Sequence, residues 1–131
     1  MKPVLEKEIE TNIYNFLQEC GFSVDKINNV GIYDANKKTY RKPGANFRPG
    51  IADLIGTLPD GRFFTIEVKS KTGKPSRAQL DWIAEKHKNK GIAFIARSVQ
   101  QVNDSLHCFY DMSKFHYILK KYQFIENCQN Q

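Results

Sequence analysis

Two short apolar runs joined by a turn constrain the fold of this chain more than any other feature. The first run covers residues 51–57 and the second covers residues 62–69. Residues 58–61 between them have the sequence Leu-Pro-Asp-Gly, which is typical of a tight turn. Runs of this length, rich in β-branched and aromatic residues and separated by such a turn, predict a β-hairpin.

Three ionisable side chains interrupt the apolar pattern of this predicted hairpin: Asp53 in the first run, and Glu67 and Lys69 in the second. With the turn centred midway between the runs, Asp53 falls opposite Ile66 or Glu67. Directly opposed residues have Cβ atoms about 5 Å apart, and like charges placed there repel each other. Glu67 and Lys69 are two residues apart and therefore share a strand face. Two carboxylates in this apolar setting need a cation, so the hairpin predicts a metal site with an ammonium group beside it.

Basic residues are concentrated on both sides of the hairpin. The chain carries 20 Lys and Arg against 14 Asp and Glu, which gives a net charge of +6. The flanking basic residues are Lys37, Lys38, Arg41, Lys42 and Arg48 before the hairpin, and Lys69, Lys71, Lys74 and Arg77 at its end and after it. A phosphate backbone attracted to both segments would lie across the carboxylates. The alternative is a basic domain whose charges are simply solvated.

Other features of the sequence exclude several classes of protein. Cys20, Cys108 and Cys128 are odd in number and far apart, so they indicate neither a disulfide framework nor a zinc site. No apolar run approaches the roughly 18 residues that span a bilayer. The N-terminus is charged and lacks the apolar core of a signal peptide. We therefore expect a cytoplasmic protein with no membrane partner.

The remaining patterns predict one α/β domain with a central mixed β-sheet flanked by helices, in the order α-β-β-β-α-β-α. Apolar residues at helical spacing predict helices over residues 3–19, 76–89 and 98–107. A further strand is expected over residues 22–33 and a loop over residues 34–50, and the apolar run 92–96 suits a buried central strand. The tail 111–126 is expected to be a helix or helix-strand element packed on the domain.

The predicted carboxylate pair has the chemistry that phosphodiester hydrolysis requires. Mg²⁺ held by one or two carboxylates can activate water and stabilise the charge on phosphorus and on the leaving oxygen. Asp53 and Glu67 would supply the carboxylates, and the Val68 carbonyl is a candidate third ligand. Lys69 would orient the water and balance charge. Hard oxygen ligands favour Mg²⁺ or Mn²⁺ over zinc. The alternative is an ordinary cross-strand ion pair on a surface hairpin.

Several segments together resemble the PD-(D/E)xK nuclease superfamily and, more narrowly, its virus-type replication-repair nuclease family, the VRR-NUC domains. They are Glu6-x-x-Ile9, residues 48–56 (RPGIADLIG), residues 61–69 (GRFFTIEVK), Ser76-x-x-Gln79 and residues 91–98 (GIAFIARS). One departure is Ala52, which stands where the superfamily has a proline that takes no part in the chemistry. The resemblance implies a restriction-endonuclease-like core.

The resemblance also implies roles for individual residues. Asp53 and Glu67 would be the metal ligands and Lys69 the catalytic lysine. Glu6 would be the helix carboxylate that approaches the same site, and is a further candidate metal ligand. Gln79 would support the lysine or contact substrate. Two alternatives stay open: Glu6 as a solvated acid favourable to the helix dipole, and Gln79 as one half of a capping box with Ser76.

Small stand-alone members of this family resemble Holliday-junction resolvases and act as homodimers. The resemblance therefore implies a Mg²⁺- or Mn²⁺-dependent, structure-selective endonuclease acting on branched DNA, of bacterial or phage origin and without an organic cofactor. Candidate DNA contacts are Arg41, Lys42, Arg48, Lys71, Lys74 and Arg77. Residues 1–131 would form one nuclease domain, with a core over about 3–107 and a tail over about 108–131 that packs on it or forms an interface. A nonspecific or restriction-type nuclease, and a non-catalytic DNA-binding domain, are the alternatives.

Overall fold

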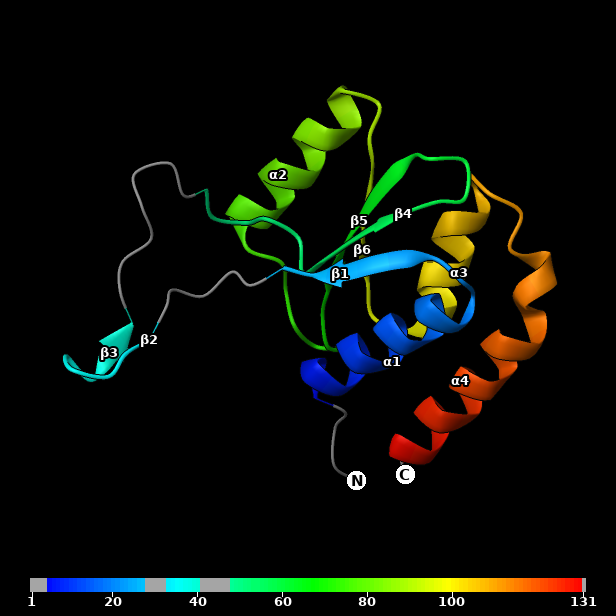
Figure 1. Ribbon diagram of the computed structural model, residues 1–131, viewed down its shortest axis with the longest axis horizontal. Coiled ribbons are helices and arrows are strands. Elements are labelled where there is room, and N and C mark those ends of the chain that lie inside the picture. Colours follow the sequence, from blue (N-terminus) through cyan, green and yellow to red (C-terminus); the bar gives the residue numbers. More distant parts are fainter. Residues whose placement is uncertain (1–4, 28–32, 41–47, 131) are drawn as a thin grey trace.

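A four-stranded mixed sheet organises the structure, a computed structural model that describes residues 5–27, 33–40 and 48–130 (Figure 1). The strands lie in the order β1 (Ser23–Lys26), β4 (Leu54–Thr57), β5 (Phe63–Val68) and β6 (Ile92–Ala96). Strand β4 pairs antiparallel with both β1 and β5, whereas β5 and β6 pair parallel. The predicted α/β fold with a central mixed sheet is confirmed.

Helices cover both faces of this sheet (Figure 1). They are α1 (Glu6–Glu19), α2 (Arg77–Lys88), α3 (Val99–His107) and α4 (His116–Gln129), with a 3₁₀ turn at Ser113–Phe115 before α4. Helices α1, α3 and α4 pack together on one face and share a cluster of twenty buried side chains with the sheet. Helix α2 covers the other face over a cluster of four, which is Ala52, Trp82, Ile83 and Ala93. None of the described helices is long and apolar enough to cross a membrane.

The predicted hairpin is confirmed in its turn and its register. Gly61, at φ +94°, donates a 2.8 Å backbone hydrogen bond to the Leu58 carbonyl. Leu54 pairs with Ile66 in the antiparallel β4–β5 ladder. One further step along this register places residue 53 across from residue 67, which was one of the two pairings that the sequence allowed.

Strand β6 lies at the edge of the four-stranded sheet, so the prediction of a central strand was wrong. The strand is apolar for a different reason: helices cover both of its faces. Ile92 and Ala96 are buried in the cluster shared with α1, α3 and α4, whereas Ala93 is buried with Trp82 beneath α2.

The predicted loop over residues 34–50 contains regular structure that the sequence analysis missed. Strands β2 (Tyr33–Asp34) and β3 (Thr39–Tyr40) form a separate two-stranded antiparallel sheet. Lys38 closes its turn at φ 52°, a backbone conformation that non-glycine residues seldom adopt. Of the predicted strand over 22–33, only Ser23–Lys26 form β1, and Tyr33 belongs to β2. Residues 28–32 and 41–47 lie outside the described residues. The predictions for Arg41 and Lys42 therefore lie outside them too.

The C-terminal tail forms α4, which packs against α1 and α3. Leu119 and Tyr122 are buried, and the Tyr122 hydroxyl donates a 2.7 Å hydrogen bond to Glu19 Oε1 at the end of α1. Nearer the C-terminus, the Asn12 amide donates a 2.7 Å hydrogen bond to Gln129 Oε1. These two contacts hold α4 along the length of α1, as expected of a packed helical tail.

Candidate active site

The carboxylates of Asp53 and Glu67 meet at one end of the β4–β5 hairpin. Asp53 precedes β4, and its Oδ2 accepts a 2.8 Å hydrogen bond from the backbone N–H of Val68. Glu67 lies near the end of β5 with only 2% of its surface exposed. The backbone hydrogen bond therefore fixes Asp53 beside a buried acid, and the structure brings the predicted pair together.

Glu67 lies in an environment that disfavours its negative charge. Burial, followed by the neighbouring charge of Asp53, raises its pKa from 4.5 to about 8, against the opposing effect of Lys69. Its Oε2 is buried and has no hydrogen-bond partner among the described residues. Buried carboxylate oxygens are normally paired, so a cation coordinated at this oxygen would supply what the described protein groups do not.

Gln79 connects this acid to helix α2. Its Nε2 donates a 2.6 Å hydrogen bond to Glu67 Oε1. At the same time its Oε1 accepts a 2.8 Å hydrogen bond from the Ser76 backbone N–H, and the Ser76 hydroxyl accepts from the Gln79 backbone N–H at 3.1 Å. The capping box is confirmed, and the two roles weighed for Gln79 are compatible because each uses a different end of its amide.

Lys69 brings a positive charge to the same pair. Its Nζ lies 3.9 Å from Glu67 Oε1, and its side chain is 14% exposed. Its backbone N–H donates to the Ala96 carbonyl at 3.0 Å, which fixes the residue against strand β6. The geometry therefore places the Lys69 ammonium group within reach of the Glu67 carboxylate.

Two carboxylates of α1 approach the site, of which the sequence analysis identified only one. Glu6 is exposed and contributes to the raised pKa of Glu67. Glu10, one turn later, was missed; burial and then the charge of Asp53 raise its pKa, which Lys26 opposes. The i,i+4 spacing that places Glu6 and Glu10 on one helix face was the available signal.

The predicted DNA contacts fall into different environments. Arg48 pairs with Glu85 of α2 at 2.8 Å and lowers the pKa of that acid to about 2. Arg77 pairs with Asp81 at 3.0 Å, one helical turn away. Lys71 and Lys74 are exposed in the loop that follows β5. The first two charges are therefore partly neutralised by α2, whereas the lysines lie directly beyond Lys69.

Arg97, which follows β6, is a second residue that the sequence analysis did not single out. Its Nη1 donates hydrogen bonds to the carbonyls of Ser70, Lys71 (3.3 Å) and Gly73 (2.6 Å). One guanidinium thus braces the loop that carries the basic side chains beyond Lys69. No sequence signal distinguishes an arginine bound to backbone carbonyls from one that is solvated.

The donor set fits a hard divalent cation. Within residues 5–27, 33–40 and 48–130, no group of three or more His, Cys, Asp or Glu side chains is arranged to hold a metal ion. Mg²⁺ needs fewer, because it keeps several waters and binds through one or two carboxylates together with substrate phosphates. Asp53 and the unpartnered Glu67 Oε2 provide such a pair, and oxygen ligands favour Mg²⁺ or Mn²⁺.

No family model matches the chain, and no curated protein matches it. A solved structure of a VRR_NUC domain is similar in fold, with a TM-score of 0.57 and 22% sequence identity over 80% of this chain and 97% of that chain. The four-stranded mixed sheet with flanking helices is consistent with that likeness. The chain therefore has the fold of a VRR-NUC domain, the family that its hairpin and helix motifs resemble.

Proposed function

We propose that this protein is a divalent-metal-dependent DNA endonuclease that hydrolyses phosphodiester bonds at the Asp53–Glu67 pair. The observation that carries the proposal is the buried carboxylate of Glu67, which lies beside Asp53 with one oxygen unpartnered among the described residues. A purely structural acid gains nothing from this arrangement, because a buried polar oxygen without a hydrogen-bond partner costs stability. The fold, shared with a solved VRR_NUC domain, supports the same conclusion.

Asp53 and Glu67 would hold Mg²⁺, with Mn²⁺ also able to bind, and the Val68 carbonyl is a candidate third ligand. Glu6 and Glu10 would act from α1 through water. When bound, the metal would lower the pKa of a coordinated water and stabilise the charge that develops on the phosphoryl group.

The other residues of the site have distinct roles in this proposal. Gln79 holds the Glu67 carboxylate in one orientation through its 2.6 Å hydrogen bond. Lys69 orients the attacking water and balances charge on the phosphate. Lys71 and Lys74 attract the DNA backbone to the loop braced by Arg97, with Arg48 and Arg77 contributing from the side of α2.

The proposed substrate is branched DNA, such as a four-way junction. The sequence contains no recognisable module for reading base sequence, and the family that the chain resembles includes junction-cleaving homodimers. A two-fold symmetric dimer would present two equivalent active sites, one for each of two symmetric cuts across a four-way junction. This symmetry is the commonest among oligomers. We propose accordingly that residues 1–131 act as one nuclease domain in a homodimer, in the cytoplasm of a bacterial or phage-infected cell.

Cleavage of labelled four-way junctions, flaps and linear duplexes in Mg²⁺ or Mn²⁺ tests the proposal. Asp53→Asn and Glu67→Gln should abolish cleavage while the protein stays folded. Asp60→Asn is the matched control, because Asp60 is an exposed acid in the hairpin turn that pairs with Arg62. Wild-type activity in both site variants would contradict the mechanism.

The same experiment separates the alternatives. Equal cleavage of junctions and linear duplexes would indicate a nonspecific or restriction-type enzyme. Salt-dependent DNA binding without cleavage in any divalent metal would indicate a non-catalytic DNA-binding domain.

A further inference from the structure

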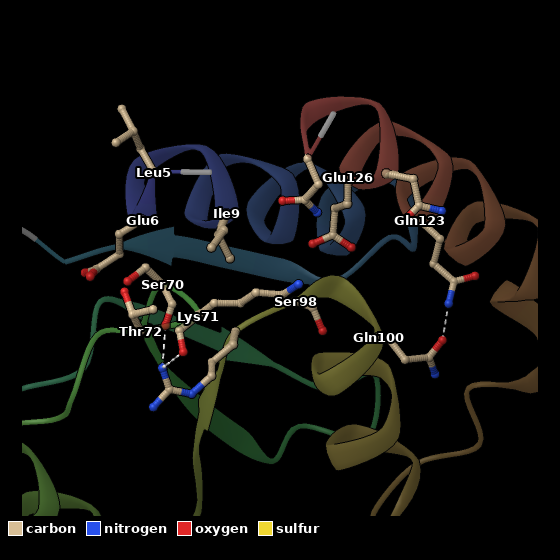
Figure 2. Close-up of a pocket in the computed structure, with 13 residues that line it drawn as sticks. Leu5, Glu6, Ile9, Ser70, Lys71, Thr72, Ser98, Gln100, Gln123 and Glu126 are labelled. Atoms are coloured by element: carbon tan, nitrogen blue, oxygen red, sulfur yellow. Dashed lines mark hydrogen bonds between the residues drawn. The ribbon is translucent and has the colours of Figure 1, made fainter. Parts of the chain in front are cut away.

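A cavity of about 840 Å³ opens beside the proposed catalytic site. It lies between the first turn of α1, the loop after β5, the start of α3 and the last turns of α4 (Figure 2). Glu6 stands at one end, near Ser70 and Thr72, whereas Gln100 and Gln123 stand at the other (Figure 2). The cavity therefore begins at the proposed active site and extends toward the C-terminal helix.

Hydrogen bonds fix the α4 wall of this cavity. The carboxylate of Glu126 accepts a 3.1 Å hydrogen bond from the Val99 backbone N–H at the start of α3. The Gln123 amide of α4 donates to Gln100 Oε1 of α3. Together with the Asn12–Gln129 contact between α1 and α4, these bonds hold the wall in place without a ligand.

The opposite wall is the loop braced by Arg97. Because Arg97 holds the carbonyls of Ser70 and Lys71, the backbone of this loop is fixed. The Lys71 side chain extends from it across the cavity toward Ser98, and the Glu126 carboxylate points in from the α4 wall (Figure 2). A positive charge thus reaches into a preformed cavity only two residues beyond Lys69.

The lining has the chemistry of a nucleotide site. Leu5 and Ile9 offer an apolar surface against which a flat ring can pack. The Gln100 amide is engaged by Gln123 and Asp104, so the Gln123 oxygen and the Asn127 amide are groups of the lining that can read a base edge. Lys71 offers a charge for the phosphate. The volume lies within the range of known ligand sites. A base that is paired and stacked in a duplex cannot enter such a cavity, whereas an unpaired base can.

We infer that this cavity binds one unpaired nucleobase of the DNA strand next to the phosphodiester bond cleaved at Asp53 and Glu67. The inference rests on the proposed function and adds a substrate class to it, namely DNA with an unpaired nucleotide beside the cut. It also gives α4, which carries none of the motifs that resemble a known family, a direct part in recognition.

The test is a scan in which each nucleotide around the cut is replaced in turn by an abasic residue. For the wild-type protein, removal of the base at one position should slow cleavage about tenfold or more, in line with the energy of base stacking and edge contacts. In Gln123→Ala/Asn127→Ala, the intact substrate should be cleaved as slowly as the abasic one. Gln18→Ala, which removes an exposed amide outside the cavity, should retain the wild-type pattern.

Binding of the same oligonucleotides in Ca²⁺, measured by fluorescence anisotropy, gives a readout that is independent of cleavage. Equal affinity for the intact and every abasic substrate would overturn the inference even if cleavage is normal. A preference for one unpaired base without cleavage in any divalent metal would sustain the cavity's role and overturn the nuclease proposal instead. Competition by free deoxynucleoside monophosphate, with no effect of abasic substitution, would assign the cavity to free nucleotides and overturn the inference.

Discussion

Gln79 joins the N-terminus of helix α2 to the buried acid of the site, because its Nε2 donates a 2.6 Å hydrogen bond to Glu67 Oε1. Its Oε1 is simultaneously the acceptor for the Ser76 backbone N–H. One side chain therefore caps the start of α2 and orients the Glu67 carboxylate. The order of the first turn of α2 and the order of the active site are consequently linked.

Replacement of Gln79 and replacement of its capping partner Ser76 should have different effects on cleavage. Ser76→Ala removes one cap hydrogen bond and should lower the free energy of unfolding by about 1 kcal/mol with little effect on cleavage. Gln79→Ala removes the reciprocal cap bond and also the bond to Glu67, so we expect a similar or larger loss of stability together with a clear loss of kcat. Urea denaturation and single-turnover cleavage measure the two effects. Equal activity of both variants would argue against a role for Gln79 at the carboxylate.

The stability of the metal-free protein should fall as the pH rises from about 4.5 to about 8. In this interval folded Glu67, whose pKa is raised, keeps a proton that the unfolded chain has lost. The free energy of unfolding then declines with pH, by at most about 1.4 kcal/mol per pH unit. Denaturant titrations in EDTA at several pH values measure this slope, and Glu67→Gln should reduce it. An unchanged slope in the variant would place its origin elsewhere.

Gly50 should tolerate substitution less well than Gly61, although both have positive φ angles of +87° and +94°. A Cβ added at Gly50 would lie 2.4 Å from the Ala78 carbonyl oxygen, whereas one at Gly61 meets nothing within 4 Å. Gly61→Ala should therefore lower the free energy of unfolding only by its backbone strain, of the order of 1–2 kcal/mol. Gly50→Ala should cost more and reduce cleavage, because α2 must shift. Thermal denaturation of the two variants provides the comparison, and equal costs would contradict it.

Arg97→Lys should loosen the loop after β5 without unfolding the protein. A lysine cannot reproduce the hydrogen bonds that the guanidinium makes to the carbonyls of Lys71 and Gly73. We expect faster trypsin cleavage after Lys71 and a raised KM for DNA. Arg62→Lys is the matched control, since Arg62 donates to the Phe109 carbonyl at 2.6 Å in a different loop. Unchanged proteolysis in Arg97→Lys would contradict the bracing role.

Thiol labelling should distinguish one cysteine from the other two. Cys108 and Cys128 are exposed and should react with a disulfide reagent in the folded protein. Cys20 is buried, and burial raises its pKa to about 12, so little reactive thiolate is present. We expect two rapidly reacting thiols and a third that reacts only on unfolding. Three rapid thiols in the native protein would show that the end of α1 opens readily.

The features predicted correctly depend on local sequence. The hairpin required only two strand-like runs and a turn, and its antiparallel geometry then limited the partner of Asp53 to Ile66 or Glu67, of which the observed register selects Glu67. The Ser76–Gln79 capping box is likewise a pattern within one helical turn. Signals of this kind are complete within a few residues and need no knowledge of distant packing.

The features that were missed depend on how separate elements meet. Glu10 lies on the same helix face as Glu6, but only the docking of α1 against the sheet shows that it feels the charge of Asp53. Arg97 reaches carbonyls 24 to 27 residues earlier in the chain. The apolar run of β6 indicated burial correctly, but burial on two faces does not specify a central position, since helices can cover an edge strand equally well.

The unequal division of the core has a consequence for motion. Among the described residues, helix α2 and the sheet share a cluster of four buried side chains, whereas the cluster on the opposite face has twenty. Regions with few buried contacts detach at a lower energy than the whole domain unfolds. Release of α2 would withdraw the Gln79 amide and admit water to Glu67. Because burial is what raises the pKa of Glu67, this pKa would fall each time α2 detaches. Detachment of α2 would then set how often water reaches Glu67.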